Sequence, residues 1–183
     1  MRALKNAMKN VVKNSSPERD GELALEFLSR VSLFEELRSN GPALRALFAV
    51  MEQRRFAPGE AILSEGEPGF EMFFLTRGEA SVLKKTTEGE FYRVAILNAN
   101  NYSFFGEGGL LDSDTRSATI LAETNCECLA LSKEQFKIFS DAHSQWAISI
   151  IFKIANTVMQ RLRKSNEDLI LIYNALVAEI RGH

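Results

Sequence analysis

The chain is predicted to fold as an α+β protein in which helices flank a central antiparallel β-sandwich or barrel. Before Arg54 the apolar residues recur with helical periodicity. After Arg54 the chain consists of short β-branched segments separated by turn residues. After Asp141 no glycine or proline interrupts the chain until Gly182, which indicates one long terminal helix. A chain of 183 residues can bury a core without disulfides or metals, so a single domain with an extra helix is expected.

The composition argues against several classes of protein. Hydrophobic residues make up 45% and charged residues 25% of the chain, and the net charge of −2 argues against a general nucleic-acid binder. No apolar run reaches the ~18 residues of a membrane span, and the N-terminus lacks the apolar core of a signal peptide. We therefore expect a cytoplasmic protein.

Cys126 and Cys128 are the two cysteines of the chain. In "NCECLAL" one residue separates them, so on a β-strand both side chains would lie on the same face. Two cysteines alone make a poor metal site, so we expect a structural role and no metal.

The first 21 residues are interpreted as a basic leader. "MRALKNAMKNVVKN" contains basic residues and no acid, and its apolar residues can share one helical face. Such a helix either lies on an anionic membrane or a partner, or packs as an ordinary leader, and the second interpretation is favoured. The following "SSPERDGE" is interpreted as a linker or a cap. The basic residues are Arg2, Lys5, Lys9 and Lys13, and the apolar ones are Leu4, Met8, Val11 and Val12.

The predicted central domain, residues 22–140, begins with two helices. The first runs from Glu22 to a turn around "SRVSLFEEL"; the second begins near Pro42, a residue suited to a first helical turn, and runs through "PALRALFAVMEQ". Strands follow as short alternating or β-branched segments between Gly, Pro, Asn and Asp residues. These segments are "EMFFLT", "EASVLKK", "YRVAIL", "SATILAE" and "CECLAL".

Residues 141–183 are predicted to form the long helix, after a shorter one that "SKEQ" begins with a capping box of Ser132 and Gln135. About 40 helical residues at 1.5 Å each make a rod of about 60 Å. Its apolar residues recur at alternating steps of four and three, a heptad seam that favours a parallel homodimer. Alternatively, the first half of the rod folds back on its own barrel. The seam consists of Val158, Leu162, Ser165, Leu169, Ile172 and Leu176.

The segment "FFGEGGLLDSDTRSAT", residues 104–119, contains the candidate site. The glycines at its start allow backbone N–H groups to approach a phosphate closely. Arg116 offers a planar fork that matches phosphate oxygens. The segment therefore predicts a site for a phosphate group. The glycines are Gly106, Gly108 and Gly109.

Three further residues of this segment refine the interpretation. Ser117 adds a hydroxyl, and the small Ala118 leaves its backbone N–H accessible. Glu107 would repel a phosphate, so we interpret it as the acceptor for a sugar hydroxyl of the same ligand. An acid and a base that contact opposite ends of one compact molecule indicate a nucleotide. An ordinary loop with a surface Glu–Arg pair is the alternative.

This segment resembles the phosphate-binding cassette of the cyclic nucleotide-binding domain family, whose pattern is F-G-E, a short helix, then R-[AST]-A. Upstream, "FAPGEAILSEGEPGFEMFFLTRGEASVL" is similar to the family's glycine-punctuated strands, and "VSLFEELRSNGPALRALFAVMEQRRF" to its helical entry. The likeness covers roughly residues 25–165. The upstream matches are Phe56, Gly59, Ile62, Glu65, Gly66, Met72, Phe74 and Gly78.

The resemblance implies an eight-stranded, jelly-roll-like β-roll with helices at both ends that binds cAMP or cGMP. Gly106 and Glu107 would hold the ribose, with Glu107 on the 2′-hydroxyl. Arg116 would pair with the cyclic phosphate, helped by Ser117 and the backbone of Ala118. Analogy with bacterial relatives that share "RSA" favours cAMP, although Ser117 could also contact a guanine amino group, and a cyclic dinucleotide stays open.

Bacterial members related to the catabolite activator protein continue into a long dimerising helix that contacts the purine. Aligning "MQRLRKSNEDL" with that helix implies base contacts for Ser165 and Asn166. Ser165 either faces the ligand or sets the coiled-coil register. Two residues depart from the family: Gly108 stands where a bulky apolar residue is usual, and Thr115 replaces a frequent proline. Both could loosen the cassette, but neither removes a ligand group.

The expected function is a stand-alone cyclic nucleotide receptor that signals through its terminal helix to an unknown effector protein. No residues follow His183 for a helix-turn-helix domain, so sequence-specific DNA binding is not expected of a complete chain. No catalytic motif is present, so we do not expect an enzyme. The alternatives are a dimeric scaffold that binds no ligand, and the sensor fragment of a larger transcription regulator or enzyme.

Overall fold

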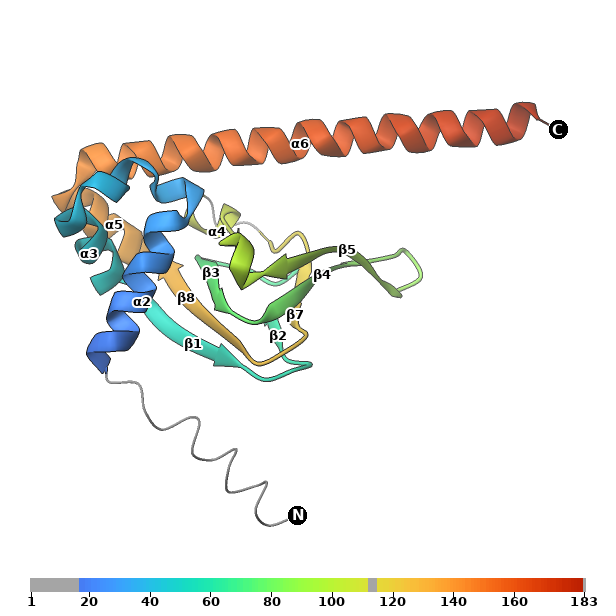
Figure 1. Cartoon of the computed structure of the whole chain (residues 1–183). Helices are drawn as coiled ribbons and strands as arrows, with labels where there is room; N and C mark the ends of the chain where they lie inside the picture. Colours follow the sequence, from blue (N-terminus) through green and yellow to red (C-terminus); the bar gives the residue numbers. More distant parts are fainter. Residues whose placement is uncertain (1–16, 112–114, 183) are drawn as a thin grey trace, which may run out of the picture.

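The computed structural model describes residues 17–111 and 115–182. Two β-sheets face each other, helices cover one end of them, and a long helix runs across that end and beyond the sheets (Figure 1). The basic leader predicted for the N-terminus lies almost wholly outside the described residues, so its helix stays a prediction.

The N-terminal helices are α2 (Pro17–Arg30), η1 (Ser32–Phe34), η2 (Glu36–Ser39) and α3 (Gly41–Ala49). Helix α3 begins as predicted: the Asn40 side chain accepts a hydrogen bond from the Ala43 N–H at 3.0 Å, with proline in the first turn. Two predicted boundaries were wrong. Helix α2 starts at its proline, which needs no hydrogen-bond partner there, so most of the predicted linker is helical. Helix α3 ends before "EQRRF", because these residues pair with another strand.

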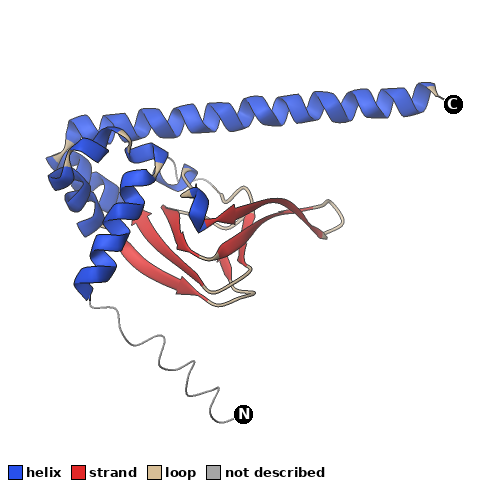
Figure 2. Cartoon of the chain, in the orientation of Figure 1, coloured by secondary structure: helices blue, strands red, loops and turns tan. Residues whose placement is uncertain are grey.

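Residues 17–111 and 115–182 contain eight antiparallel strands, which confirm the predicted fold class (Figure 2). They form two four-stranded sheets in the orders β1-β8-β3-β6 and β2-β7-β4-β5. Strands β3, β4, β5, β7 and β8 match the predicted segments, whereas β1, β2 and β6 were not predicted individually. The bounds are β1 (Glu52–Phe56), β2 (Ala61–Leu63), β3 (Glu71–Arg77), β4 (Glu79–Lys85), β5 (Phe91–Asn98), β6 (Phe104–Phe105), β7 (Thr119–Ala122) and β8 (Cys126–Ser132).

In the described part of the chain, the buried apolar residues form two clusters. One lies inside the β-roll and includes Phe73 and Phe105, whose rings stack at 5.6 Å, together with both cysteines. Cys126 and Cys128 are each 1% exposed on the same face of β8, as predicted. Burial raises the pKa of the Cys128 thiol to about 12, so this thiol stays protonated at neutral pH. The other cluster joins the helices to the sheet through residues such as Phe34, which packs on the ring of β3's Phe74.

The remaining helices are η3 (Ala99–Asn101), α4 (Gly108–Leu111), α5 (Lys133–Ala142) and α6 (Ser144–Arg181). The capping box predicted for Ser132 and Gln135 is present at the start of α5. Within the described chain, no helix is both long and apolar enough to cross a membrane.

Helix α6 has 38 residues and divides into two parts. Its first part is packed: Ile150 and Ile154 are buried, and the Lys153 ammonium lies 2.8 Å from a Glu35 carboxylate oxygen. The rest extends past the β-roll (Figure 1). The alternative prediction, that the helix packs on its own domain, therefore holds only for the first part of α6. The apolar seam residues are 40–66% exposed in the single chain: Val158, Leu162, Leu169, Ile172 and Leu176.

Candidate functional site

The candidate site is formed around the turn between β6 and α4. Strand β6 pairs with β3, and the chain then turns at Gly106, whose φ of +75° favours glycine. Glu107 follows and is 8% exposed, although it is charged. The pairing with β3 therefore fixes a buried carboxylate at the edge of the roll.

Arg116 returns to the same turn from the segment before β7. Its backbone is held by the loop between β2 and β3: the Arg116 N–H donates to the Glu67 carbonyl at 2.8 Å, and the Gly66 N–H donates to the Arg116 carbonyl at 2.9 Å. The partly buried guanidinium donates from Nη1 to the Gly106 carbonyl at 3.2 Å. The structure thus brings Gly106, Glu107 and Arg116 together, as the sequence predicted.

Three glycines make room for this guanidinium. A Cβ atom at Gly69 would lie 2.0 Å from Nε of Arg116, and one at Gly106 would lie 2.9 Å from Nη1. At Gly109 a Cβ would lie 2.8 Å from the backbone N and O of Glu71 and 3.0 Å from Nη1 of Arg116. Gly69 was missed by the sequence analysis, because "PG" locally indicates only a turn, and its contact with Arg116 spans the β2–β3 loop.

The Gly69→Ala variant is expected to bind an anionic ligand of this site at least about tenfold more weakly, a loss of about 1.4 kcal/mol. The added methyl group would overlap the guanidinium, so the Arg116 side chain must leave its position. Isothermal titration calorimetry of the variant measures this loss. Gly59→Ala is the control: a Cβ there has nothing within 4 Å, and because its φ is +83° whereas Gly69 does not have a positive φ, any loss from backbone strain alone is larger in the control. Equal affinity of the Gly69 and Gly59 variants would contradict the crowding argument.

Among the residues that the structure describes, no carboxylate forms an ion pair with Arg116. Burial lowers the pKa of the Arg116 guanidinium, and the nearby carboxylates of Glu71 and Glu107 act in the opposite direction. Each of these carboxylates is bonded to a different arginine, Glu71 to Arg54 and Glu107 to Arg161. Among the described residues, the hydrogen bond that Arg116 donates goes to a neutral carbonyl. A partly desolvated cation in this state is suited to bind an anion.

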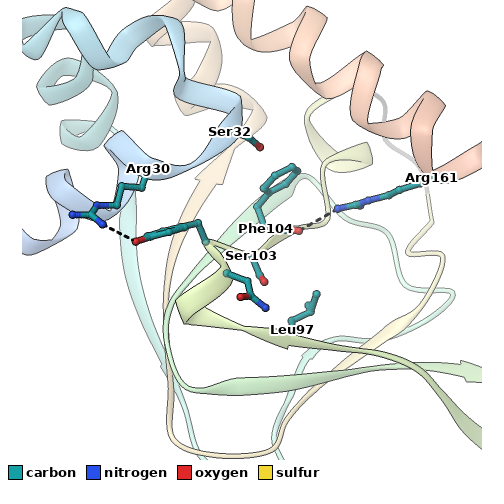
Figure 3. Close-up of a pocket in the computed structure, with 8 residues that line it drawn as sticks. Arg30, Ser32, Leu97, Ser103, Phe104 and Arg161 are labelled. Atoms are coloured by element: carbon teal, nitrogen blue, oxygen red, sulfur yellow. Dashed lines mark hydrogen bonds between the residues drawn. The ribbon is translucent and has the colours of Figure 1, made fainter. Parts of the chain in front are cut away.

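Arg161 reaches the site from α6. Its Nη1 donates to Oε1 of Glu107, and its guanidinium lies 5.5 Å from the centre of the Phe104 ring. Figure 3 shows a second, longer contact, from Nη2 to the Phe104 carbonyl at 3.5 Å. Arg161 could not be predicted from a local pattern, because 54 residues separate it from Glu107.

Arg161 also lines an open cavity of about 220 Å³ between α2, η3 and α6 (Figure 3). On its far side the Arg30 guanidinium donates to the Tyr102 hydroxyl at 3.3 Å. The cavity lies beside Phe104, away from the glycines that surround Arg116. Arg161 of α6 thus contacts Glu107 at the site and also lines this cavity.

The other predicted site residues take different positions. Gly108 is exposed at the first position of α4, and Ala118 is partly buried. Ser117 is exposed, and its carbonyl accepts a hydrogen bond from the Lys84 ammonium, which also lies 3.1 Å from Glu65. This β4 lysine, which the sequence analysis missed, holds the backbone next to Arg116.

Ser165 and Asn166 are exposed on α6, beyond the part that packs on the domain. Ser165 lies four residues after Arg161, so the two share one helical face directed towards the site. Asn166 is about 100° further round the helix and points elsewhere. Ser165 is therefore one helical turn beyond Arg161 on the same face of α6, and among the described residues it has no hydrogen bond to the site.

The described residues contain no group of His, Cys, Asp and Glu side chains that could hold a metal ion. At one edge of the eight strands that the structure describes, the site combines a glycine turn, a buried carboxylate and an arginine that donates to a neutral carbonyl. Residues 53–143 match the family model of the cyclic nucleotide-binding domain. This part of the chain belongs to that family, which confirms the resemblance seen in the sequence.

Known proteins of this kind resemble much of the chain. The cGMP-dependent protein kinase 2 of Mus musculus is 32% identical over 133 residues, which cover 72% of this chain but only 17% of the kinase. A cyclic nucleotide-binding domain from Methylobacillus flagellatus superposes with a TM-score of 0.70 at 20% identity and covers 83% of each chain. A cAMP-bound PfPKA-R structure gives a TM-score of 0.60 at 25% identity, over 69% of this chain and 43% of that one.

Proposed function

We propose that this chain is a receptor for a cyclic nucleotide, with Arg116 on the cyclic phosphate and Glu107 on the ribose 2′-hydroxyl. The observation that carries the proposal is the partly buried Arg116 guanidinium, which faces a glycine turn and hydrogen-bonds a neutral carbonyl. The backbone of Gly106, Gly108 and Ala118 and the hydroxyl of Ser117 complete the binding of phosphate and sugar.

The preferred ligand is cAMP. The cAMP-bound relative of known structure supports this preference, while the similarity to a cGMP-dependent kinase makes cGMP the second candidate. Ser165 contacts the purine in this proposal, since it follows Arg161 on the face of α6 that meets the site. Asn166, about 100° further round, contacts the base only if α6 rotates or a second chain approaches.

The output of the receptor is a change in the packing of α6. Arg161 bonds the same carboxylate that the ribose would use, so ligand and helix compete for Glu107. A ligand shifts a conformational equilibrium by its differential affinity for the two states, and this competition supplies such a difference. In this proposal the exposed seam of α6 pairs with a second copy, and an effector protein recognises the helix. The domain itself is regulatory, not catalytic.

Titration of the purified chain with cAMP and with cGMP tests the proposal. A true ligand at 100 times its dissociation constant is expected to add about 2.7 kcal/mol to the free energy of unfolding, because it binds the folded state only. Hydrogen exchange of α6 around Arg161 is expected to change in the same sample. A melting temperature that does not move in millimolar cAMP or cGMP would contradict the receptor function.

A further inference from the structure

A second arginine, Arg54, forms a two-point ion pair at the edge of the site. Its Nη1 lies 2.8 Å from Oε2 of Glu71 and its Nη2 lies 2.5 Å from Oε1 of the same residue. Arg54 comes from β1 and Glu71 from β3, and β8 lies between these two strands. Both side chains are partly buried, so the pair is better shielded from water than a surface ion pair.

The geometry of Arg54 is fixed from two further sides. Its guanidinium lies 5.7 Å from the centre of the Phe73 ring, and Nη2 lies 3.1 Å from a carboxylate oxygen of Glu52. A planar guanidinium can occupy both oxygens of one carboxylate, which an ammonium group cannot do. Arg54 therefore engages the whole Glu71 carboxylate.

Glu71 is also close to the proposed phosphate-binding arginine. Gly109 lies between them: its Cβ would be 2.8 Å from the Glu71 backbone and 3.0 Å from Nη1 of Arg116. The Glu71 charge is the largest single influence that favours the charged form of Arg116. Because the Glu71 charge acts on Arg116 and the two residues lie on either side of Gly109, this carboxylate is a potential internal competitor for any anion that Arg116 binds.

We infer that Arg54 is a positioning residue for ligand binding: by occupying both oxygens of Glu71, it keeps this carboxylate away from Arg116 and leaves the Arg116 guanidinium available to an anionic ligand. The inference rests on the proposed function, since it takes the cyclic phosphate as that anion. It assigns Arg54, the first arginine of "RR" in β1, a role that neither its strand position nor the cassette motif indicates. Without Arg54, the phosphate would have to displace Glu71 and overcome its repulsion.

Three variants test the inference by calorimetry with cAMP and cGMP. Arg54→Gln is expected to weaken binding about tenfold, which corresponds to about 1.4 kcal/mol. Arg54→Gln combined with Glu71→Gln is expected to restore the affinity to within about twofold, because the competitor is then neutral. Glu71→Gln alone is expected to bind at least as well as the unmodified chain. Affinity that falls and recovers without a matching change in melting temperature separates positioning from a structural role, because a purely structural pair would change stability and affinity together.

Arg55→Gln is the matched control. Arg55 is the next residue of β1, is well exposed, and lies 3.7 Å from Glu127 on the opposite side of the strand from the Glu71 pair. Melting temperatures of all variants show whether each remains folded. Unchanged affinity of Arg54→Gln, or a double variant as weak as the single one, would overturn the inference. If the unmodified chain binds neither nucleotide, the proposed function itself fails, which is a different outcome.

Discussion

Replacing Arg116 with alanine is expected to weaken cyclic nucleotide binding by about 100- to 3000-fold. In the complex the cyclic phosphate and the Arg116 guanidinium form a desolvated charge pair, and removing one side of such a pair costs about 3–5 kcal/mol. The variant is expected to stay folded, because the side chain donates a hydrogen bond only to the Gly106 carbonyl among the described residues. Calorimetry measures the affinity, and thermal melting checks the fold.

Arg93→Ala is the control for this prediction. Arg93 lies on the exposed strand β5, outside the cassette. Its replacement by alanine removes the same charge from the chain as Arg116→Ala does. It is expected to leave the affinity unchanged within about twofold, which separates local contact from long-range attraction of an anion. Retained affinity in Arg116→Ala would remove the basis of the site assignment.

Replacing Leu169 and Ile172 together with lysine is expected to convert a dimer into a monomer. Both residues belong to the exposed seam of α6, and each contributes about 1.5–3 kcal/mol when it is buried against a second helix. The unmodified chain is expected to show twice its mass of 20.5 kDa in light scattering, and the variant is expected to show 20.5 kDa.

Glu167→Lys combined with Asn174→Lys is the matched control, since these two positions lie on the side of α6 opposite the seam. This pair is expected to remain dimeric. A monomeric mass for the unmodified chain, at concentrations where the ligand binds, would rule out the seam as a dimer interface. The receptor function would survive that result, because the site residues come from one chain.

Local patterns were enough to predict much of the fold. Ser132 and Gln135 form their capping box from residues three apart, and Cys126 and Cys128 share a strand face because side chains alternate. That Glu107 and Arg116 lie near the same turn was also predicted, since both belong to one short motif of the sequence. In each case the determining residues are close in sequence.

The features that escaped prediction depend on contacts between distant segments. Arg161 meets Glu107 across 54 residues, and Arg54 meets Glu71 across an intervening strand. Strand β6 has only two residues, too few for an alternating pattern, and exists because β3 pairs with it. The predicted extension of α3 was wrong for a similar reason, since pairing of Glu52–Phe56 with β8 outweighs the helical preference of these residues.

The position of Arg161 gives α6 the properties of a lever. Among the described residues it is the last one of this helix with a hydrogen bond or ion pair to the rest of the chain, and the helix continues to Arg181. The free arm, residues 162–181, is about 30 Å long, so a tilt of about 10° at its pivot would carry the tip through about 5 Å. A small movement of Arg161 at Glu107 would therefore displace the C-terminal end of α6 by about the height of one helical turn. A partner bound at that end could detect this displacement.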